Sequence, residues 1–302
     1  MSTSATSHKS PPQWFYKCLL LAAAAIWGLG TCVIKDTVAD FPAPWLMGLR
    51  FFCAGLVLLV VCWPRVRKFL TPDTIGAGIV IGLALGPAYL CNTVGLTGTT
   101  ASKSAFLTST YVVMVPFIAW AVSRQRPTKF NLLAALLSVV GIGFVSFSGN
   151  AEEGLSFGFG EALTLLSAFL LGVHLAVSAK LSEGRDALTL TAVQFITGGI
   201  IGMAAGFVTS GAPPLQQLVQ PDTLLNFAYL VIFASCVALS LQNIGIKHVA
   251  AAPAALFLST ESLFGVLFAV LLFGDALTPF MVLGFACIAA GIVMNETLAR
   301  GK

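Results

Sequence analysis

Charge is scarce in this 302-residue sequence, in which Asp, Glu, Lys and Arg together make up only 9% of the residues. Soluble globular domains carry about 25% charged residues, so a surface that faces water on all sides is excluded. Hydrophobic residues make up 57% of the chain, and the mean hydropathy is +0.93. The longest connection between apolar runs, 209–223, is a short proline-containing loop, so we expect no separate soluble domain.

Motifs for nucleotide binding and metal-dependent hydrolysis are also missing. The sequence has no P-loop, no His-Glu-x-x-His pair and no cluster of aspartates. The seven cysteines lie within or at the ends of apolar runs, and none forms a Cys-x-x-Cys spacing. We therefore expect no catalytic residue, no metal and no cofactor, and a protein that is not an enzyme.

What the sequence does contain is a series of apolar runs long enough to cross a bilayer, which takes about 20 helical residues. They predict an all-α polytopic membrane protein with ten transmembrane helices. The runs are 17–35, 44–63, 75–96, 101–122, 130–148, 157–179, 187–208, 224–243, 252–273 and 279–297.

The basic residues predict how this protein is oriented. If the N-terminus is cytoplasmic, thirteen of the sixteen Lys and Arg residues fall on the inside; Lys35 and Lys103 fall outside, and Arg50 lies within the second run. Cytoplasmic connections are enriched in Lys and Arg, so we expect a multi-pass cell-membrane protein with both termini in the cytoplasm. The net charge of +4 follows from this topology, and we expect no nucleic-acid partner.

The two halves of the chain also resemble each other at an offset of 150 residues. Matched pairs include Gly95 with Gly245, Ser109 with Ser259, and Thr110 with Thr260; upstream the offset falls to 144 or 145. Five helices per copy is an odd number, so the second copy must be inverted in the membrane. Inverted repeats are typical of secondary transporters, whose binding site lies near the midplane. We expect a tail at 1–16, a first repeat at 17–150 and a second at 151–302.

Several segments are similar to the EamA type of the drug/metabolite transporter (DMT) superfamily. They include WGLGTCVIK (27–35), LRFFCAGL (49–56) and SKSAFLTSTYVVM (102–114), and the similarity covers nearly the whole chain. The resemblance implies ten helices in two inverted EamA repeats, and export of amino acids, other metabolites or drugs by uniport, exchange or proton coupling. Members often carry proline where Ser262 follows Glu261, so the usual cause of a helix kink is missing here.

Deep polar residues are the candidates for a substrate site, and they are suited to a small zwitterion. On the sixth run, Glu161, Thr164, Ser167, His174 and Ser178 share one helical face that lines a cavity or binds neighbouring helices. The repeat alignment pairs Tyr111 with Glu261, and Gln194 with Arg50. The candidate binding residues are Trp27, Tyr89, Asn92, Thr108, Tyr111, His174, Gln194, Gln242, Asn243 and Glu261.

Glu261 lies near the bilayer centre, where an unpaired carboxylate is costly. Three roles are open to it: a structural partner, neutral or paired with Lys103 or Arg50; a ligand for a substrate amine; or a carrier of the coupling proton. Glu261 and His174 are the proton-coupling candidates.

The sequence thus predicts a secondary transporter that exports small metabolites, such as amino acids, by alternating access, either as a uniporter or coupled to protons. The alternatives are a multidrug or toxic-compound efflux carrier and a membrane-embedded enzyme that uses His174 and Glu261. The expected partners are a small-molecule substrate and the lipid bilayer, and the expected state is a monomer or homodimer.

Overall fold

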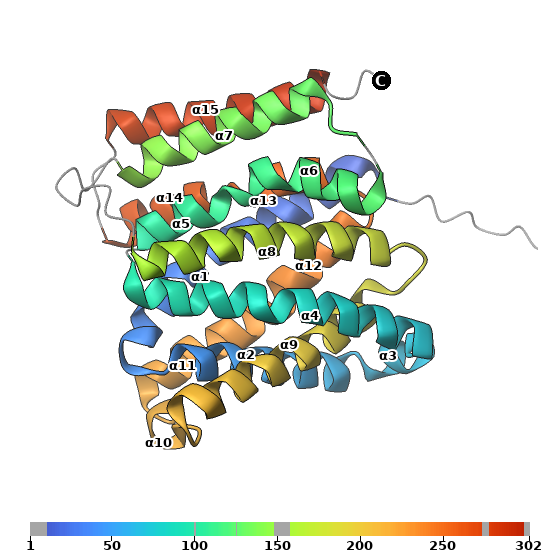
Figure 1. Ribbon diagram of the computed structural model, residues 1–302, viewed down its shortest axis with the longest axis vertical. Helices are drawn as coiled ribbons and strands as arrows, with labels where there is room; N and C mark the ends of the chain where they lie inside the picture. Colours follow the sequence, from blue (N-terminus) through green and yellow to red (C-terminus); the bar gives the residue numbers. More distant parts are fainter. Residues whose placement is uncertain (1–10, 100, 125, 148–157, 274–277, 299–302) are drawn as a thin grey trace, which may run out of the picture.

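The computed structural model describes residues 11–99, 101–124, 126–147, 158–273 and 278–298, and the regular secondary structure of these residues is helical, without strands (Figure 1). The first half contains α1 (Gln13–Asp40), α2 (Ala43–Val61), α3 (Trp63–Phe69), α4 (Pro72–Gly95), η1 (Leu96–Gly98), α5 (Ala101–Ser109), α6 (Tyr111–Ser123) and α7 (Lys129–Phe147). The second contains α8 (Phe159–Leu181), α9 (Ala187–Ser210), α10 (Leu215–Leu218), α11 (Pro221–Tyr229), η2 (Leu230–Val237), α12 (Ala238–Ile246), α13 (Ala251–Leu258), α14 (Glu261–Phe273) and α15 (Pro279–Leu298).

Seven helical segments in the described part are long and apolar enough to cross a membrane, and α7 and α15 contain shorter apolar helices. The ninth predicted run, 252–273, is covered by α13 and α14, which are separated by two residues. This all-α architecture confirms the predicted fold class and is consistent with ten spans. One detail was wrong: the expected loop 209–223 contains the short helix α10 and the start of α11.

Local sequence signals place several helix ends. Thr71 precedes Pro72 and accepts a hydrogen bond from the Thr74 N–H at 3.2 Å, which caps α4. Asp186 accepts from the Thr189 N–H at 3.1 Å, which caps α9. These side chains satisfy backbone donors that have no partner within the helix.

Close pairs of helices form the two outer layers of the molecule. In Figure 1, α7 lies beside α15 at one edge, and α2 lies with α9 at the opposite side. Glycines allow this approach: a Cβ added at Gly48 would lie 2.6 Å from the carbonyl carbon of Gly202, and one added at Gly141 would lie 2.6 Å from the Gly284 oxygen. Small residues at such contacts let membrane helices pack through their backbones.

The centre consists of two groups of helices that mirror the internal repeat. The α1 group joins α1 to α12, α13 and α14, and the α8 group joins α8 to α4, α5 and α6. Equivalent glycines make equivalent contacts: Gly245 packs on the Tyr16 carbonyl in the α1 group, and Gly95 packs on the Gly160 carbonyl in the α8 group. Each group therefore combines the first helix of one repeat with the third and fourth helices of the other.

Each group contains one broken helix, and the two breaks lie 150 residues apart. Thr110 separates α5 from α6, and its hydroxyl donates to the Leu107 carbonyl at 2.6 Å. Thr260 donates to the Phe257 carbonyl at the same distance, just before α14. Hydroxyl bonds to the preceding turn bend helices. The chain thus breaks before Glu261 although Ser262 stands where proline is common in the transporters that the sequence resembles.

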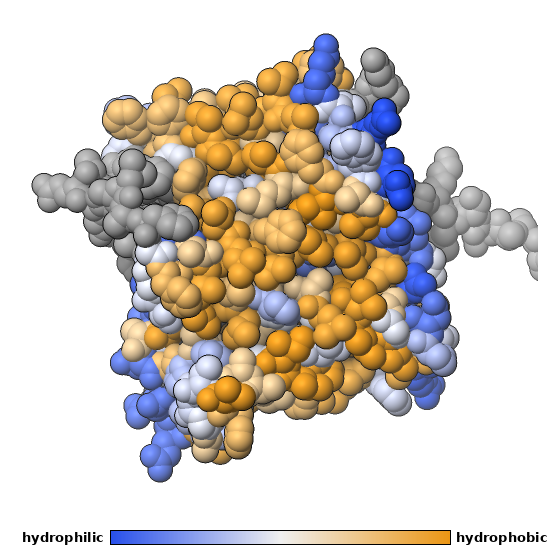
Figure 2. All heavy atoms as spheres, in the orientation of Figure 1, coloured by the Kyte–Doolittle hydropathy of each residue, from blue (hydrophilic) through white to orange (hydrophobic). Residues whose placement is uncertain are grey.

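The two ends of the molecule differ in charge. Figure 2 shows a broad hydrophobic surface between a strongly hydrophilic edge, where α3 lies in Figure 1, and a smaller hydrophilic region near α10. We call the first the basic end; its residues include Lys17, Arg65, Arg67, Lys68, Arg124, Arg126, Lys129, Lys180, Arg185 and Lys247. We call the other the acidic end; it carries Asp36, Asp40, Glu161 and Asp222.

Ion pairs link the connections at the basic end. Arg65 lies 2.7 Å from Asp186, and Arg185 lies 2.8 Å from Asp73. Burial by itself would raise the pKa of Asp186, but the Arg65 guanidinium and the bonds from Thr189 outweigh it and hold that pKa below its usual value. The ionised carboxylate thus ties α3 to the start of α9.

The contact between α2 and α9 gives a first prediction. Gly48→Ala is expected to lower the free energy of unfolding by about 1–3 kcal/mol, because the new methyl group would overlap backbone atoms of α9. Gly76→Ala is the matched control, since a Cβ at Gly76 meets no atom within 4 Å. Thermal unfolding in detergent measures both variants, and equal melting temperatures would contradict the close packing.

Candidate functional site

A cavity of about 80 Å³ lies between the α1 group and the α8 group. At about 10–15 Å³ for each water, it holds roughly five to eight water molecules. Polar side chains from both repeats line it. They are Trp27 and Thr31 of α1, Arg50 of α2, Tyr89 and Asn92 of α4, Ser104, Thr108 and Ser109 of α5, Tyr111 of α6, His174 of α8, Gln242 of α12, and Glu261 and Ser262 of α14.

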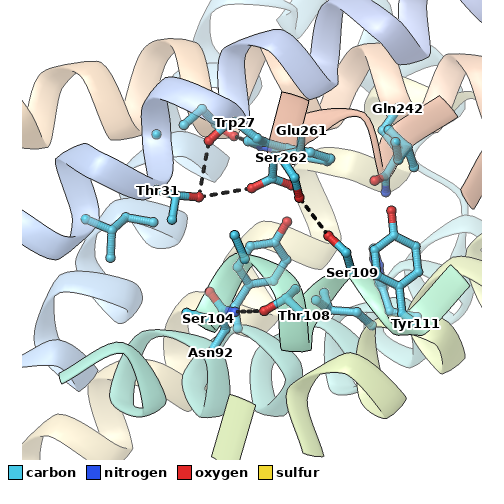
Figure 3. Close-up of a pocket in the computed structure, with 18 of the residues that line it drawn as sticks. Trp27, Thr31, Asn92, Ser104, Thr108, Ser109, Tyr111, Gln242, Glu261 and Ser262 are labelled. Atoms are coloured by element: carbon cyan, nitrogen blue, oxygen red, sulfur yellow. Dashed lines mark hydrogen bonds between the residues drawn. The ribbon is translucent and has the colours of Figure 1, made fainter. Parts of the chain in front are cut away.

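Glu261 is held at the wall of this cavity by the break in its helix. It is the first residue of α14, where the N-terminal end of the helix dipole favours a negative charge. The Thr31 hydroxyl donates to Glu261 Oε1 at 3.0 Å, as the dashed line in Figure 3 shows. The next residue, Ser262, lies 3.1 Å from Ser109, so the two broken helices meet beside the carboxylate.

Arg50 brings a positive charge to the same cavity. Its side chain is only 2% exposed, and its guanidinium lies 4.6 Å from the centre of the Phe51 ring and 5.5 Å from that of Tyr89. Its Nε has no hydrogen-bond partner, and the structure records no ion pair between Arg50 and Glu261, both of which it describes. Buried charges are costly without partners. The cavity is therefore lined by one basic and one acidic side chain that form no direct ion pair with each other.

Backbone carbonyls of neighbouring helices fix the aromatic walls. Trp27 Nε1 donates to the Ala234 carbonyl at 2.8 Å, within the π-helical segment η2. The Tyr111 hydroxyl donates to the Ala255 carbonyl at 3.3 Å and so links the two groups. Departures from α-helical bonding within a helix are frequent at functional sites.

Eight of the ten predicted binding residues line the cavity, and two do not. Gln194 lies behind His174 and bonds its Nε2 at 3.0 Å, while Asn243 donates to the Thr191 hydroxyl at 2.8 Å. Both are buried, at 0% and 3% exposed. They support the wall and do not form its surface.

The polar residues that were predicted to share one face of α8 have two different roles: part of the face lines the cavity, and part bonds neighbouring segments. His174 lines the cavity. Glu161 instead accepts from the Gly158 N–H at 2.9 Å and from the Thr99 hydroxyl at 2.7 Å, and Thr164 donates to the Gly160 carbonyl. The outer part of this face therefore bonds backbone and the neighbouring connection.

The prediction missed several cavity residues. Arg50 was predicted as the repeat partner of Gln194 and as a possible partner of Glu261, but not as a binding residue, although an arginine inside a transmembrane run is itself a strong signal of function. Ser104, Ser109 and Ser262 were missed because serine is common in membrane helices. The side chain of Lys103, a possible partner of Glu261, lies outside the described residues. In the described part, no three His, Cys, Asp or Glu side chains are grouped to hold a metal ion.

The profile of the EamA-like transporter family matches residues 14–147 and 158–297. The chain belongs to the EamA-like transporter family. An "Uncharacterized transporter" of Archaeoglobus fulgidus is 30% identical over 277 residues, covering 91% of this chain and 83% of the relative. The "Uncharacterized transporter YetK" of Bacillus subtilis is 25% identical, covering 91% and 85%.

Two further matches are a relative whose name includes a substrate and a solved structure. A protein of Bacillus cereus named "Probable glucose uptake protein GlcU" is 25% identical over 61% of this EamA-like chain and 66% of its own. A crystal structure with 15% identity matches with a TM-score of 0.79, covering 95% of this chain and 98% of the other. This second match supports the fold alone.

The bond between His174 and Gln194 gives a second prediction. His174→Ala and Gln194→Ala should each lower the free energy of unfolding by about 1–3 kcal/mol, because each leaves a buried polar partner unsatisfied. The double variant should cost less than the sum of the two, by about 1 kcal/mol. A double-mutant cycle by thermal unfolding measures this difference, and strict additivity would contradict a direct bond.

Proposed function

We propose that this EamA-like membrane transporter is a secondary transporter that exports small zwitterionic metabolites, with amino acids as the simplest class. The two repeats, 17–150 and 151–302, alternate in opening the central cavity to either side. The basic end faces the cytoplasm, as the enrichment of Lys and Arg in cytoplasmic connections favours. Substrate enters there and leaves at the acidic end.

The observation that carries the proposal is that Arg50 and Glu261 line one cavity without forming a direct ion pair. Arg50 can bind a carboxylate through two parallel hydrogen bonds, a geometry that guanidinium groups favour. Glu261 can accept a hydrogen bond from an ammonium group on the other side. A solute with both groups satisfies both buried charges together, which neither a neutral sugar nor a hydrophobic cation does.

Glu261 has the amine-binding role in this proposal, and it is also a candidate to carry the coupling proton. A carboxylate can bind the amine during export and a proton during the return. His174 is the second coupling candidate, since it lines the same cavity. A pH gradient applied in the transport assay separates coupled export from uniport.

Transport by reconstituted protein tests the proposal. Proteoliposomes are loaded with a mixture of amino acids, organic acids, amines and glucose, and efflux is followed by mass spectrometry with and without a pH gradient. We expect selective efflux of one or more zwitterions. Efflux of glucose or of hydrophobic cations alone would overturn the proposal.

Variants of the two charged residues give the third prediction. Arg50→Gln and Glu261→Gln should each reduce efflux of the zwitterion roughly 10- to 100-fold at low concentration, since each removes a charge-assisted hydrogen bond worth about 1.5–3 kcal/mol. Lys68→Gln, at the exposed basic end, is the control and should transport normally. If Glu261→Gln transports normally but no longer responds to the pH gradient, Glu261 carries the proton and does not bind the amine.

A further inference from the structure

A lysine joins the two central groups at the acidic end. Lys35, near the end of α1, donates to the Leu96 carbonyl at 2.9 Å and to the Thr99 carbonyl at 2.8 Å. These carbonyls lie in the connection between α4 and α5, where the C-terminal end of a helix favours a positive charge. The bonds run from the α1 group to the α8 group and so join the two groups at this end.

The repeat places a second lysine and a second connection at the basic end. Lys180 lies 145 residues after Lys35, near the end of α8, and Ile246 and Val249 lie 150 residues after Leu96 and Thr99. The connection has the same form in both repeats: the helix ends in a tight turn, followed by a bend at Thr99 or at Val249.

Lys180 does not make the equivalent bonds. Its ammonium group donates to the Val122 carbonyl at 2.6 Å, at the end of α6 and within its own α8 group. In the described part of the chain, no hydrogen bond is recorded to the carbonyls of Ile246 and Val249. One other bond joins the groups nearby, from Lys247 to the Arg185 carbonyl at 2.7 Å.

A large cavity occupies the place where the missing bonds would lie. It has a volume of about 730 Å³ at the basic end, and Lys180, Ile246 and Val249 all line it. About one helical turn separates it from the central cavity, filled by small or branched side chains such as Val115, Ala254 and Ala255, each fully buried. The two ends therefore differ: Lys35 bonds the two central groups at the acidic end, whereas the equivalent carbonyls at the basic end line a large cavity.

We infer that Lys35 and Lys180 are equivalent gating residues, one for each end of the transport path, and we call them latches. Each latch closes its end when its ammonium group binds backbone carbonyls of the other central group. In inverted-repeat transporters the opposite-facing state arises when the two repeats exchange conformations. In that state Lys180 leaves Val122 and binds the carbonyls of Ile246 and Val249, while Lys35 releases Leu96 and Thr99. The inference rests on the proposed function, because it presupposes alternating access.

The competing explanation is that Lys180 is an ordinary surface charge at the basic end. The two explanations differ in what removal of Lys180 does at the opposite end of the molecule, about a bilayer thickness away. A surface charge has no effect there. If Lys180 is a latch, it stabilises the state that is open at the acidic end, so removal of Lys180 makes the acidic end less accessible.

Labelling of single cysteines tests the inference. In a variant with all seven native cysteines replaced, Ser104→Cys reports the cavity near the acidic end and Ala119→Cys reports the cavity at the basic end. Maleimide labelling rates are measured in nanodiscs without substrate. We expect Ala119→Cys to react quickly and Ser104→Cys slowly.

The lysine variants then move the two rates in opposite directions. Lys35→Met should raise the Ser104→Cys rate about tenfold and lower the Ala119→Cys rate. Lys180→Met should lower the Ser104→Cys rate at least threefold, and Lys68→Met should change neither. Lys35→Arg and Lys180→Arg should keep the original rates, because guanidinium groups also bind carbonyls.

An unchanged Ser104→Cys rate in Lys35→Met, or a Lys180→Met variant that behaves like Lys68→Met, would overturn the inference. Thermal unfolding identifies any methionine variant that loses its fold. In that case the arginine variants provide the test, because they should keep the original labelling rates. Because labelling needs no substrate, its result is independent of the zwitterion assay. If the protein exports zwitterions but fails the labelling test, the proposed function stands and only the inference about the latches is overturned.

Discussion

The constraint on which this structure depends is that hydrocarbon offers no hydrogen bonds to the chain. Every backbone group must be satisfied within the protein, and each charge must find a partner, reach water or face an internal cavity. The helices follow from the first requirement. Arg50 and Glu261 show the second, since both lie deep in the molecule and face one cavity. The same constraint explains the clustered polar side chains between the two groups of helices.

Where the helices break or depart from α-helical bonding, residues at those places take part in the site. The breaks before Tyr111 and Glu261 place equivalent residues of the two repeats on the cavity wall. The π-helical turn of η2 gives Trp27 a carbonyl to bind. At the acidic end, Lys35 binds the carbonyls that terminate α4 and η1. Irregular backbone at this depth is tolerated because it lines a cavity or meets another side chain.

Most of the fold and most of the site could be predicted from the sequence, because hydrophobic run length and deep polar residues are strong signals. Glu261 and Tyr111 were found in this way, and their pairing in the repeats placed them together. Side-chain direction was harder to predict. Gln194 is as deep and as polar as its neighbours, yet it faces His174 and not the cavity. The position of Arg50 within a transmembrane run is a signal of function, but its two aromatic neighbours come from tertiary packing and could not be predicted. The helix breaks depend on hydroxyl bonds that serine and threonine make in some helices and not in others.

The central claim is that the cavity recognises two opposite charges on one solute. Its most direct test is thermal stabilisation of the purified protein by each amino acid, compared with the matching amide, which lacks the carboxylate, and the matching deaminated acid, which lacks the amine. We predict that at least one amino acid raises the melting temperature, and that its amide and its deaminated acid do not. Equal stabilisation by a compound with only one of the two charges would contradict the claim.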